Sequence, residues 1–580
     1  MFIRRLIFLY FLLSLAFPAV TAFAVPADET SAGESDVSSD LETLEPLIRE
    51  RIYQEGIRGT LIICGGGTIP DEAKKAFVDS IDKERSVLIL PVAANDPEAA
   101  VASATQWMIK FGVQQIVSPE TATTDAEVIA ETRDKIRLAG AVWICGGQQT
   151  RIAEAYVGTD VETALRELID RGGVIGGTSA GAAIITKVMI ASGKDKPEMA
   201  TGFDFLPDAI VDQHFAERDR SDRLRYAIAE NPQRFGLGID EATAVIVIGR
   251  NVDVVGNGSA TVVLSKVAGV DVNGRLSNGR EEVVQKMPAG SRADLTQLRR
   301  AARWRASGID PGQPLGDVRQ VTSGSLVIVG GGGMPKEIVD RFVELAGGAD
   351  ARIVVMPTAG SREEAFRQKP PRFLTVAGVK SVIMLPQSRT EEVASDAFRL
   401  ALEQATGIWF DGGRQWNFVD AYENTEAVEM FHDVLRRGGV IGGSSAGATI
   451  QGEYLVRGHP LGNFVMMAEG YERGFSFLPG VAIDQHFSQR NRFPDLIPVV
   501  ERHRQILGVG IDEATAIVVT KSRADVIGRG AAHFIDSNLI ETAEVNETAN
   551  PVDDESPKRR YRSIDAGKSI DLKTLEVLDQ

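Results

Sequence analysis

Two short stretches of the sequence could present a serine hydroxyl for nucleophilic attack. Residues 171–183 read RGGVIGGTSAGAA, and residues 437–449 read RGGVIGGSSAGAT. Each contains Gly-x-Ser-x-Gly, centred on Ser179 or Ser445, between an apolar run and an Ala-rich segment, which predicts a strand, a sharp turn and a helix. Such a turn pushes the hydroxyl outward and brings backbone N–H groups to the same place, where an oxyanion could be stabilised. One copy could be an ordinary glycine-rich turn, but two copies in similar surroundings favour a nucleophile elbow.

A serine nucleophile needs a base to remove its proton, and histidine is the usual base near neutral pH. The first half of the chain holds a single histidine, His214, within Asp-Gln-His-Phe at 212–215. The second half has several, but only His486 lies in the same four-residue sequence, at 484–487. A lone histidine is usually a structural residue, whereas its repetition together with an elbow favours a role as the base.

The base in turn needs an acid that holds its tautomer and stabilises the imidazolium. The sequence Gly-Ile-Asp-Glu-Ala-Thr occurs at 238–243 and again at 510–515. The candidates are therefore Glu241 and Glu513, with Asp240 and Asp512 beside them. The order along the chain is serine, histidine, acid, whereas an α/β-hydrolase has serine, acid, histidine, so the similarity to that fold ends at the elbow.

The motifs recur because the chain is an internal duplication. The glycine-rich segments at 65–70 and 146–149 recur at 330–335 and 412–415, and the elbow, histidine and glutamate motifs recur after them in the same order. Short apolar strands alternate with helical stretches in the first repeat, at 61–64, 87–90, 115–117 and 141–145. This rhythm predicts an α/β fold in which a mainly parallel sheet is covered by helices on both faces. The glycine-rich motifs follow the strands, where such sheets bind ligands.

The sequence divides into five segments. Residues 1–24 have a basic start, an apolar run and Ala-Phe-Ala at 22–24, a pattern typical of a signal peptide. We therefore expect an exported protein, periplasmic or extracellular, without a membrane span after cleavage. Residues 25–41 are expected to be a flexible acidic lead-in. The remaining boundaries place the first repeat at 42–300, a linker at 301–322 and the second repeat at 323–580.

Composition excludes some partners and cofactors. A net charge of -17 and a pI near 5.1 argue against nucleic acid, because phosphate binding needs a basic surface. No Cys/His spacing typical of zinc appears, and we expect neither a metal nor a cofactor. The two cysteines, Cys64 and Cys145, end predicted strands and are expected in the core, although a disulfide between them stays possible in an exported protein.

Arginines follow each histidine. Three follow the first one: Arg218, Arg220 and Arg223. They could hold substrate carboxylates through paired hydrogen bonds, or they could form a solvated helix face with the acidic residues between them. In the second repeat Arg490 and Arg492 remain, but Asp495 stands where the third arginine would be, so the second site is expected to bind differently or weakly.

Four motifs in this order resemble the cyanophycinases: Gly-Gly-x-Gln, Gly-Gly-Thr-Ser-Ala-Gly-Ala, Asp-Gln-His-Phe-x-x-Arg-x-Arg-x-x-Arg-Leu and Gly-Ile-Asp-Glu-Ala-Thr-Ala. Cyanophycinases belong to the serine peptidase family S51, which also includes aspartyl dipeptidase. The resemblance covers nearly all of each repeat. It implies two tandem domains of the class I glutamine-amidotransferase-like (flavodoxin-like) α/β fold, with serine in place of the cysteine nucleophile. Because family members are dimers, it also implies that the two repeats pair as an intramolecular pseudo-dimer.

The resemblance further implies a role for each motif residue. The nucleophile, base and acid would be Ser179, His214 and Glu241 in the first repeat, and Ser445, His486 and Glu513 in the second. The oxyanion holes would be formed by backbone N–H groups of Gly147 and Ala180, and of Gly413 and Ala446. The substrate site would be lined by Gln149, Asp212, Gln213, Arg218, Arg220 and Arg223, and in the second repeat by Gln415, Asp484, Gln485, Arg490 and Arg492.

The implied substrate is cyanophycin, a poly-aspartate chain with arginine on its side-chain carboxyls, and the implied products are β-aspartyl-arginine dipeptides. Two alternatives stay open. Gln148 and Arg414 stand where cyanophycinases tend to have Asp, which favours a peptidase of the same fold that acts on other aspartyl peptides or isopeptides. A non-catalytic binding protein on this scaffold is the other alternative, and two complete sets of motif residues argue against it.

Overall fold

The computed structural model describes residues 54–119, 126–270, 276–308, 318–540 and 561–579. The predicted signal peptide (1–24) and acidic lead-in (25–41) lie outside these residues, so export stays a prediction. None of the helices in the described ranges combines the length and apolar character needed to cross a bilayer.

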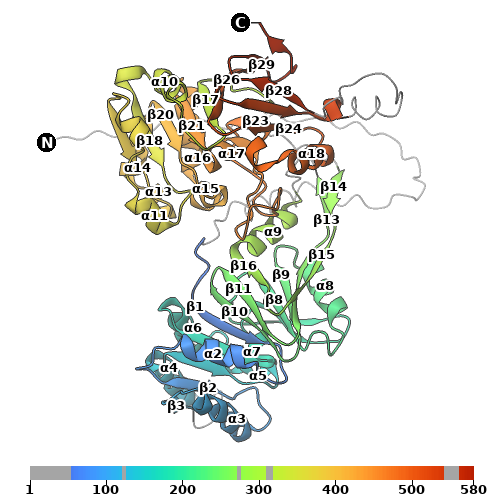
Figure 1. Ribbon diagram of the computed structural model, residues 1–580. Coiled ribbons are helices and arrows are strands. Elements are labelled where there is room, and N and C mark those ends of the chain that lie inside the picture. Colours follow the sequence, from blue (N-terminus) through green and yellow to red (C-terminus); the bar gives the residue numbers. More distant parts are fainter. Residues whose placement is uncertain (1–53, 120–125, 271–275, 309–317, 541–560, 580) are drawn as a thin grey trace, which may run out of the picture. The chain divides into compact units, whose positions relative to one another are not determined.

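The first repeat contains a mixed eight-stranded sheet with a parallel half and an antiparallel half (Figure 1, blue to green). Its strand order is β16-β11-β10-β1-β5-β4-β2-β3, and the strands from β1 to β3 in this order run parallel. In chain order the strands are β1 (Ile57–Cys64), β2 (Val87–Leu90), β3 (Ile116–Val117), β4 (Ala141–Ile144), β5 (Val174–Thr178), β10 (Thr243–Gly249), β11 (Asn251–Gly256) and β16 (Arg292–Asp294).

A smaller sheet, two hairpins and eight helices complete the described part of the first repeat. The smaller sheet has the order β15-β12-β9-β8, from β8 (Ala209–Gln213), β9 (Phe235–Ile239), β12 (Ser259–Leu264) and β15 (Val283–Pro288). The helices are α2 (Asp71–Asp79), α3 (Pro97–Lys110), α4 (Ala126–Leu138), α5 (Gln149–Tyr156), α6 (Asp160–Asp170), α7 (Ala180–Ala183), α8 (Ser221–Ala229) and α9 (Leu295–Ser307). Two hairpins, β6 (Val188–Ser192) with β7 (Glu198–Thr201) and β13 (Val267–Val270) with β14 (Leu276–Arg280), lie outside the two sheets.

Both faces of the parallel strands are buried, as their unbroken apolar sequences predict. In β1, Leu61 and Ile63 pack in one core cluster with residues of α5 and α6, whereas Ile62 and Cys64 pack in another with residues of α2 and α3. The predicted α/β fold with helices on both faces is therefore confirmed, although the sheet is extended on one side by antiparallel strands.

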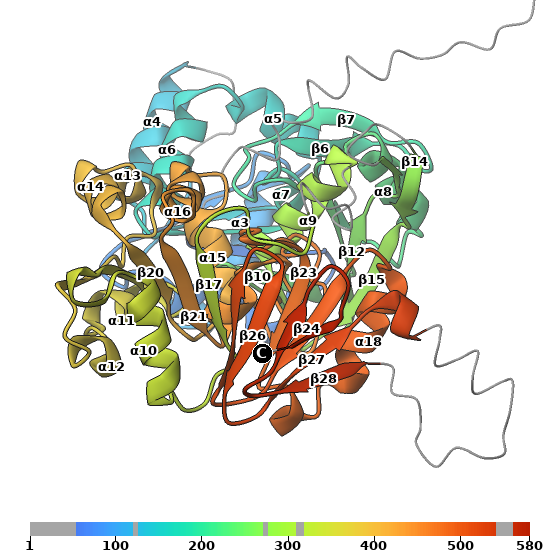
Figure 2. The same cartoon turned by 90° about the horizontal axis from the view of Figure 1, so that it is seen from above.

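The second repeat has the same strand order in its main sheet, β19-β18-β20-β21-β17-β25-β26-β29-β30, with one short strand added at the edge. Figure 2 shows β20, β21 and β17 between α10 on one side and α15 and α16 on the other, and the core clusters include these helices. The strands are β17 (Ser325–Val329), β18 (Arg352–Met356), β19 (Ser381–Met384), β20 (Gly407–Phe410), β21 (Val440–Ser444), β25 (Thr515–Thr520), β26 (Arg523–Gly528), β29 (Ser569–Asp571) and β30 (Val577–Leu578).

The smaller sheet of the second repeat gains a strand, with the order β22-β23-β24-β27-β28. Its strands are β22 (Gly452–Tyr454), β23 (Leu478–Gln485), β24 (Leu507–Ile511), β27 (Ala531–Ile535) and β28 (Arg562–Asp565). The helices of this repeat are α10 (Lys336–Leu345), α11 (Arg362–Arg367), α12 (Arg372–Thr375), α13 (Thr390–Val393), α14 (Asp396–Gln404), α15 (Gln415–Tyr422), α16 (Glu426–Arg436), α17 (Ala446–Thr449) and α18 (Phe493–Arg502).

Helix α9 runs past the boundary that the sequence predicts at residue 300. The side chain of Asp294 accepts a hydrogen bond from the N–H of Gln297 and caps the helix, which ends at Gly308 in the left-handed conformation. The predicted linker therefore begins with helix, because its first residues continue a run of Leu, Ala and Arg that favours helix.

The two cysteines are buried and free, without a disulfide between them. Burial raises the pKa of the Cys64 thiol to about 12, and burial raises the pKa of the Cys145 thiol to about 12 as well. Both therefore behave as core residues, and the possible disulfide is absent from this structure.

Candidate active site

Ser179 and Ser445 lie in the sharp turn that the sequence predicts, between β5 and α7 and between β21 and α17. Their φ angles are 53° and 55°, a conformation that non-glycine residues rarely adopt. The turn closes tightly because a Cβ on Gly177 would lie 2.3 Å from the carbonyl oxygen of Gly181. A Cβ on Gly181 would lie 2.2 Å from the carbonyl oxygen of Ile144 in β4, so both glycines of Gly-x-Ser-x-Gly are required by close backbone contacts. The serine between them is held in a strained conformation.

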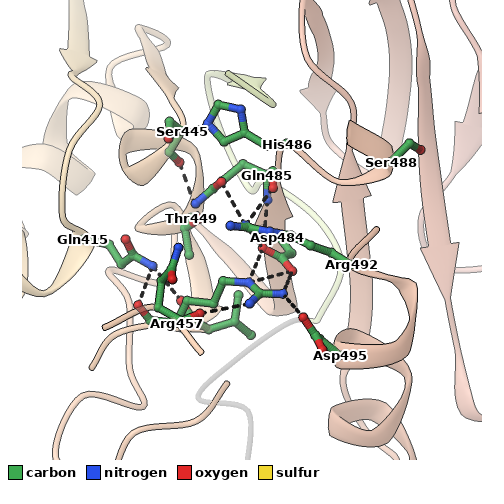
Figure 3. Close-up of polar contacts among 12 residues, drawn as sticks. Gln415, Ser445, Thr449, Arg457, Asp484, Gln485, His486, Ser488, Arg492 and Asp495 are labelled. Carbon is green, nitrogen blue, oxygen red and sulfur yellow. Dashed lines mark hydrogen bonds and ion pairs between the residues drawn. The ribbon is translucent and has the colours of Figure 1, made fainter. Parts of the chain in front are cut away.

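Each serine contacts the histidine of its own repeat, and that histidine contacts the glutamate. Ser179 Oγ lies 2.8 Å from His214 Nε2, and His214 Nδ1 lies 2.5 Å from Glu241 Oε1. The same two distances are 3.0 Å and 2.6 Å for Ser445, His486 and Glu513 (Figure 3 labels the serine and the histidine). With Nδ1 protonated and bonded to the carboxylate, Nε2 can accept the serine proton, which is the arrangement that acyl transfer needs.

The end of β1 brings the three side chains of the first repeat together. The N–H of Ser179 donates to the carbonyl of Cys64 (3.0 Å), and the N–H of His214 donates to the carbonyl of Gly65 (2.7 Å). The residue after Glu241, Ala242, donates its N–H to the carbonyl of Gly66 (3.0 Å). In the second repeat the last residue of β17 and the two glycines after it accept the matching bonds from the N–H groups of Ser445, His486 and Ala514, so one strand end fixes all three backbones.

Glycines in this strand end make room for the histidine and the glutamate. A Cβ on Gly66 would lie 2.2 Å from His214 Cε1, and one on Gly331 would lie 2.3 Å from His486 Cε1. The next glycine, Gly67, faces the side chain of Glu241 in the same way. Sequence reasoning found the repeated glycine runs at 65–67 and 330–332 but not this role, which depends on contacts with residues far away in the sequence.

The acid that meets each histidine is the glutamate and not the neighbouring aspartate. Asp240 accepts hydrogen bonds from the N–H groups of Ala216 and Ser259, both 3.1 Å, and so holds the loop around the site. The N–H of Glu241 donates to Glu217 Oε2 (2.9 Å). Of the two candidates that the sequence leaves open, the glutamate is the one in contact with the imidazole, and its role as the acid stays a prediction.

The surroundings of each histidine favour its neutral form. Burial lowers the pKa of His214 below its ordinary value, and the positive charge of Arg218 lowers it further, while Glu241 acts in the opposite direction. Burial also lowers the pKa of His486, where Arg490 replaces Arg218. A neutral imidazole is the form that can accept a proton from serine.

The residues expected around the substrate divide into two groups. Arg218 and Arg490 are exposed beside the histidines, and within the part of the chain that the structure describes neither makes an ion pair. The other predicted residues make hydrogen bonds within the protein. Gln149 and Gln415 donate their side-chain amides to backbone carbonyls of the segment that follows the elbow, at 2.8 to 3.0 Å.

The remaining arginines surround a buried carboxylate. In the first repeat Arg220 and Arg223 both donate to Asp212, whose side chain is fully buried, and Arg220 also donates to Gln213 Oε1 (2.9 Å). In the second repeat Arg492 makes the same contacts with Asp484 and Gln485. A second arginine, Arg457, also contacts Asp484, and sequence reasoning did not find it.

The proposed oxyanion residues lie beside each serine. A Cβ on Gly146 would lie 3.4 Å from Ser179 Cβ, so the chain at 146–147 passes the nucleophile. Gly147 has φ of 143°, and a Cβ there would lie 1.9 Å from the carbonyl oxygen of Ala93, so only glycine fits. Gly413 repeats this geometry at φ of 151°, and Ala180 and Ala446 are the first helical residues after each serine.

Comparison with known proteins identifies relatives for both repeats. The sequence model of peptidase family S51 matches two regions of the chain, residues 61–255 and 322–527. Cyanophycinase of Geminocystis herdmanii is 29% identical over 229 residues, which cover 38% of this chain and 84% of that protein. Cyanophycinase of Trichormus variabilis is 30% identical over 242 residues, which cover 40% of this chain and 80% of that protein. Among solved structures, a peptidase from an acI-B1 Actinobacterium aligns with 42% of this chain and 99% of its own, at 17% identity and a TM-score of 0.32.

Proposed function

The chain belongs to peptidase family S51 and is a serine-type peptidase, and on this premise we propose that it is an exported enzyme that hydrolyses cyanophycin to β-aspartyl-arginine dipeptides. The observation that carries the proposal is the same in both repeats: a serine, a histidine and a glutamate in hydrogen-bond contact, with an exposed arginine beside them. Both repeats are proposed to be active. Pairing of the repeats with each other stays a prediction.

In the proposed mechanism Ser179 Oγ attacks the carbonyl carbon of the scissile bond while its proton moves to His214 Nε2. The carbonyl oxygen becomes an oxyanion that the N–H groups of Gly147 and Ala180 stabilise. Glu241 accepts the hydrogen bond from Nδ1 and stabilises the imidazolium. When the intermediate collapses, the leaving amine takes the proton from Nε2 and the acyl group stays on Ser179 as an ester.

Water completes the reaction by the reverse sequence of proton transfers. Nε2 accepts a proton from the water, whose oxygen attacks the ester carbonyl, and the proton then returns to Ser179 Oγ as the dipeptide acid leaves. In the second repeat Ser445, His486 and Glu513 perform the same steps, with Gly413 and Ala446 as the oxyanion donors.

The charges near the serine fit a substrate that carries both signs. Cyanophycin presents carboxylates and guanidinium groups, and an exposed guanidinium such as that of Arg218 can bind a carboxylate through two parallel hydrogen bonds. The chain as a whole is acidic, with a net charge of -17, which is compatible with a substrate rich in arginine.

The pH dependence of the first site should change when Arg218 is replaced. In a Ser445→Ala background, kcat/KM should fall as the pH drops through the pKa of His214, which burial and Arg218 hold below its ordinary value of about 6.5. Removing the positive charge in Arg218→Gln stabilises the imidazolium, so this acidic limb should move to higher pH. Arg225→Gln removes a charge from the exposed side of α8, where Arg225 pairs with Glu282, and should leave the limb in place. If the acidic limb of the pH profile is unchanged or moves to lower pH in Arg218→Gln, the assignment of this limb to His214 beside Arg218 would be contradicted.

The substrate proposal is tested by release of β-aspartyl-arginine from purified cyanophycin. The mature chain should be assayed beside Ser179→Ala, Ser445→Ala and the double variant, with fluorophosphonate labelling of the serines as a measurement that needs no substrate. We expect release from the wild type and from each single variant, and none from the double variant.

Two other outcomes of this assay would contradict different parts of the proposal. Loss of release in Ser179→Ala alone would make the second repeat a non-catalytic partner. Labelling of both serines without any dipeptide release would exclude cyanophycin and leave the alternative, a serine peptidase for other aspartyl peptides or isopeptides.

A further inference from the structure

The two repeats differ at a pair of matched positions next to the site. Gln149 Nε2 donates to the carbonyl oxygen of Ala191 (2.9 Å), and Gln415 Nε2 donates to that of Arg457 (2.8 Å). The two glutamines end the repeated Gly-Gly-x-Gln motif, and Ala191 and Arg457 follow them at the same interval along the chain, so these two residues occupy equivalent places. An alanine in the first site is therefore an arginine in the second.

The second matched position lies on a helix. Arg223 is the third residue of α8, and Asp495 is the third residue of α18. Each follows the histidine of its own repeat at the same interval along the chain. At this place an arginine in the first site is an aspartate in the second.

The two changes leave the same ion pair in both sites. Arg223 donates Nε and Nη2 to the two oxygens of Asp212, at 2.7 and 2.5 Å. Arg457 donates Nε to both oxygens of Asp484, at 3.0 and 3.1 Å, and Nη2 to one of them at 3.0 Å. Both carboxylates are 0% exposed. The guanidinium comes from the helix in the first site and from the segment after β22 in the second.

Arg457 also neutralises the aspartate that replaced the helix arginine. Its Nη2 lies 2.7 Å from Asp495 Oδ2, and Figure 3 shows the guanidinium between Asp484 and Asp495. Two carboxylates on neighbouring elements would repel each other without a cation between them. The relocated arginine therefore also balances the negative charge that the helix aspartate adds.

The ion pair between Arg457 and Asp484 is connected to His486, the base of the second site. Asp484 Oδ1 accepts the N–H of Gln485 (3.1 Å) and Nη1 of Arg492 (2.6 Å), and Arg492 also donates to Gln485 Oε1 (3.0 Å). Gln485 directly precedes His486, which has a positive φ of 51° and so has little freedom to readjust. Movement of the buried carboxylate would reach the imidazole through one residue.

Arg457 is buried and points its hydrogen bonds into the protein, not toward a substrate. Nε and Nη2 donate to the aspartates and Nη1 donates to the carbonyl of Asn463 (2.9 Å), while the side chain is 4% exposed. We propose that Arg457 is the positioning arginine of the second site, in place of Arg223 in the first, and that it keeps the second site competent although Asp495 occupies the helix position. This inference rests on the proposed peptidase activity of the second site.

A swap of the two residues tests the proposal in the full-length mature chain. In a Ser179→Ala background, where only the second site reports, we would compare Arg457→Ala, Asp495→Arg and the double variant, which recreates the arrangement of the first repeat. The measurements are kcat and KM for dipeptide release, the rate of fluorophosphonate labelling of Ser445, and Tm. Arg457→Ala should lower kcat and the labelling rate at least ~10-fold, because misplacing a reacting group by about 1 Å costs rate steeply.

The double variant decides the outcome. Its kcat and labelling rate should return to within about threefold of the parent, because the effects of substitutions at contacting residues of one ion-pair network are not additive. If Arg457→Ala folds poorly, a double variant that restores Tm but not the labelling rate would overturn the proposal. Parent-like rates in Arg457→Ala would overturn it as well. Arg223→Ala in a Ser445→Ala background is the matched control and should show the same loss in the first site.

The two readouts separate this inference from the substrate proposal. Labelling of Ser445 that depends on Arg457, without any release from cyanophycin, would refute the substrate and keep the positioning role. Release from cyanophycin that is independent of Arg457 would refute the positioning role alone.

Discussion

Replacing Gly66 with alanine is expected to lower the activity of the first site at least ~100-fold, because the new Cβ would lie 2.2 Å from His214 Cε1 and push the imidazole away from Ser179. The imidazole cannot yield easily, since His214 itself has a positive φ of 49° and its N–H is bonded to the carbonyl of Gly65. The variant should be measured in a Ser445→Ala background by dipeptide release and by fluorophosphonate labelling of Ser179.

Backbone strain must be separated from the clash, and the chain offers a matched control. Gly66 has φ of 114°, so alanine there is strained whatever its neighbours are. Gly112 has φ of 98° and nothing within 4 Å of the place where a Cβ would lie, so Gly112→Ala carries the strain without the clash. It should lower Tm by a few degrees, as a loss of about 1 kcal/mol does, and keep labelling near the parent rate. Equal activity losses in the two variants would show that strain, and not displacement of His214, is responsible.

Much of the fold follows from the sequence because the parallel strands are buried on both faces. Strands β2 and β4 and the second half of β1 are short apolar runs, which identify them without any partner being known. The antiparallel half of the main sheet and the smaller sheet were not predicted. Strand β9, Phe-Gly-Leu-Gly-Ile, is rich in glycine because Cβ atoms at Gly236 and Gly238 would meet Ile228 and Phe215, and such contacts cannot be read from a local pattern.

The repeated motifs predict which residues belong to the candidate site, but they do not predict how the side chains contact one another. The motifs of Ser179, His214 and Glu241 occur twice, which predicts that they act together, and the structure brings the three side chains together. The choice between Glu241 and Asp240 depends on which side chain faces the imidazole. The sequence does not show this, because the two carboxylates are adjacent and both recur in the second repeat. The sequence does not reveal the role of Arg457. Aligning the two repeats shows only that α18 lacks the arginine that α8 has, whereas the arginine that takes its place comes from the segment after β22.

Replacing Glu241 with glutamine is expected to lower kcat of the first site by roughly 10³- to 10⁴-fold, as loss of the acid does in related serine hydrolase arrangements. The carboxylate accepts the Nδ1–H bond at 2.5 Å and so keeps the proton on Nδ1. An amide can instead turn its NH₂ group toward Nδ1, which favours the tautomer with the proton on Nε2, and this tautomer cannot accept the serine proton. The charge that stabilises the imidazolium is lost at the same time.

The second repeat supplies the controls for this variant. Glu241→Gln should be silent in a Ser179→Ala background, where only the second site works, and severe in a Ser445→Ala background. Glu217→Gln is the control, because it makes the same chemical change at a residue that accepts the backbone N–H of Glu241. The second repeat already has a glutamine at this position, Gln489, whose Oε1 accepts the N–H of Glu513 at 2.9 Å. Glu217→Gln should therefore stay within about threefold of the parent, because an amide oxygen accepts that bond equally well. If Glu241→Gln kept the parent kcat, another group would have to hold His214, and the Ser–His–Glu assignment of the first site would be wrong.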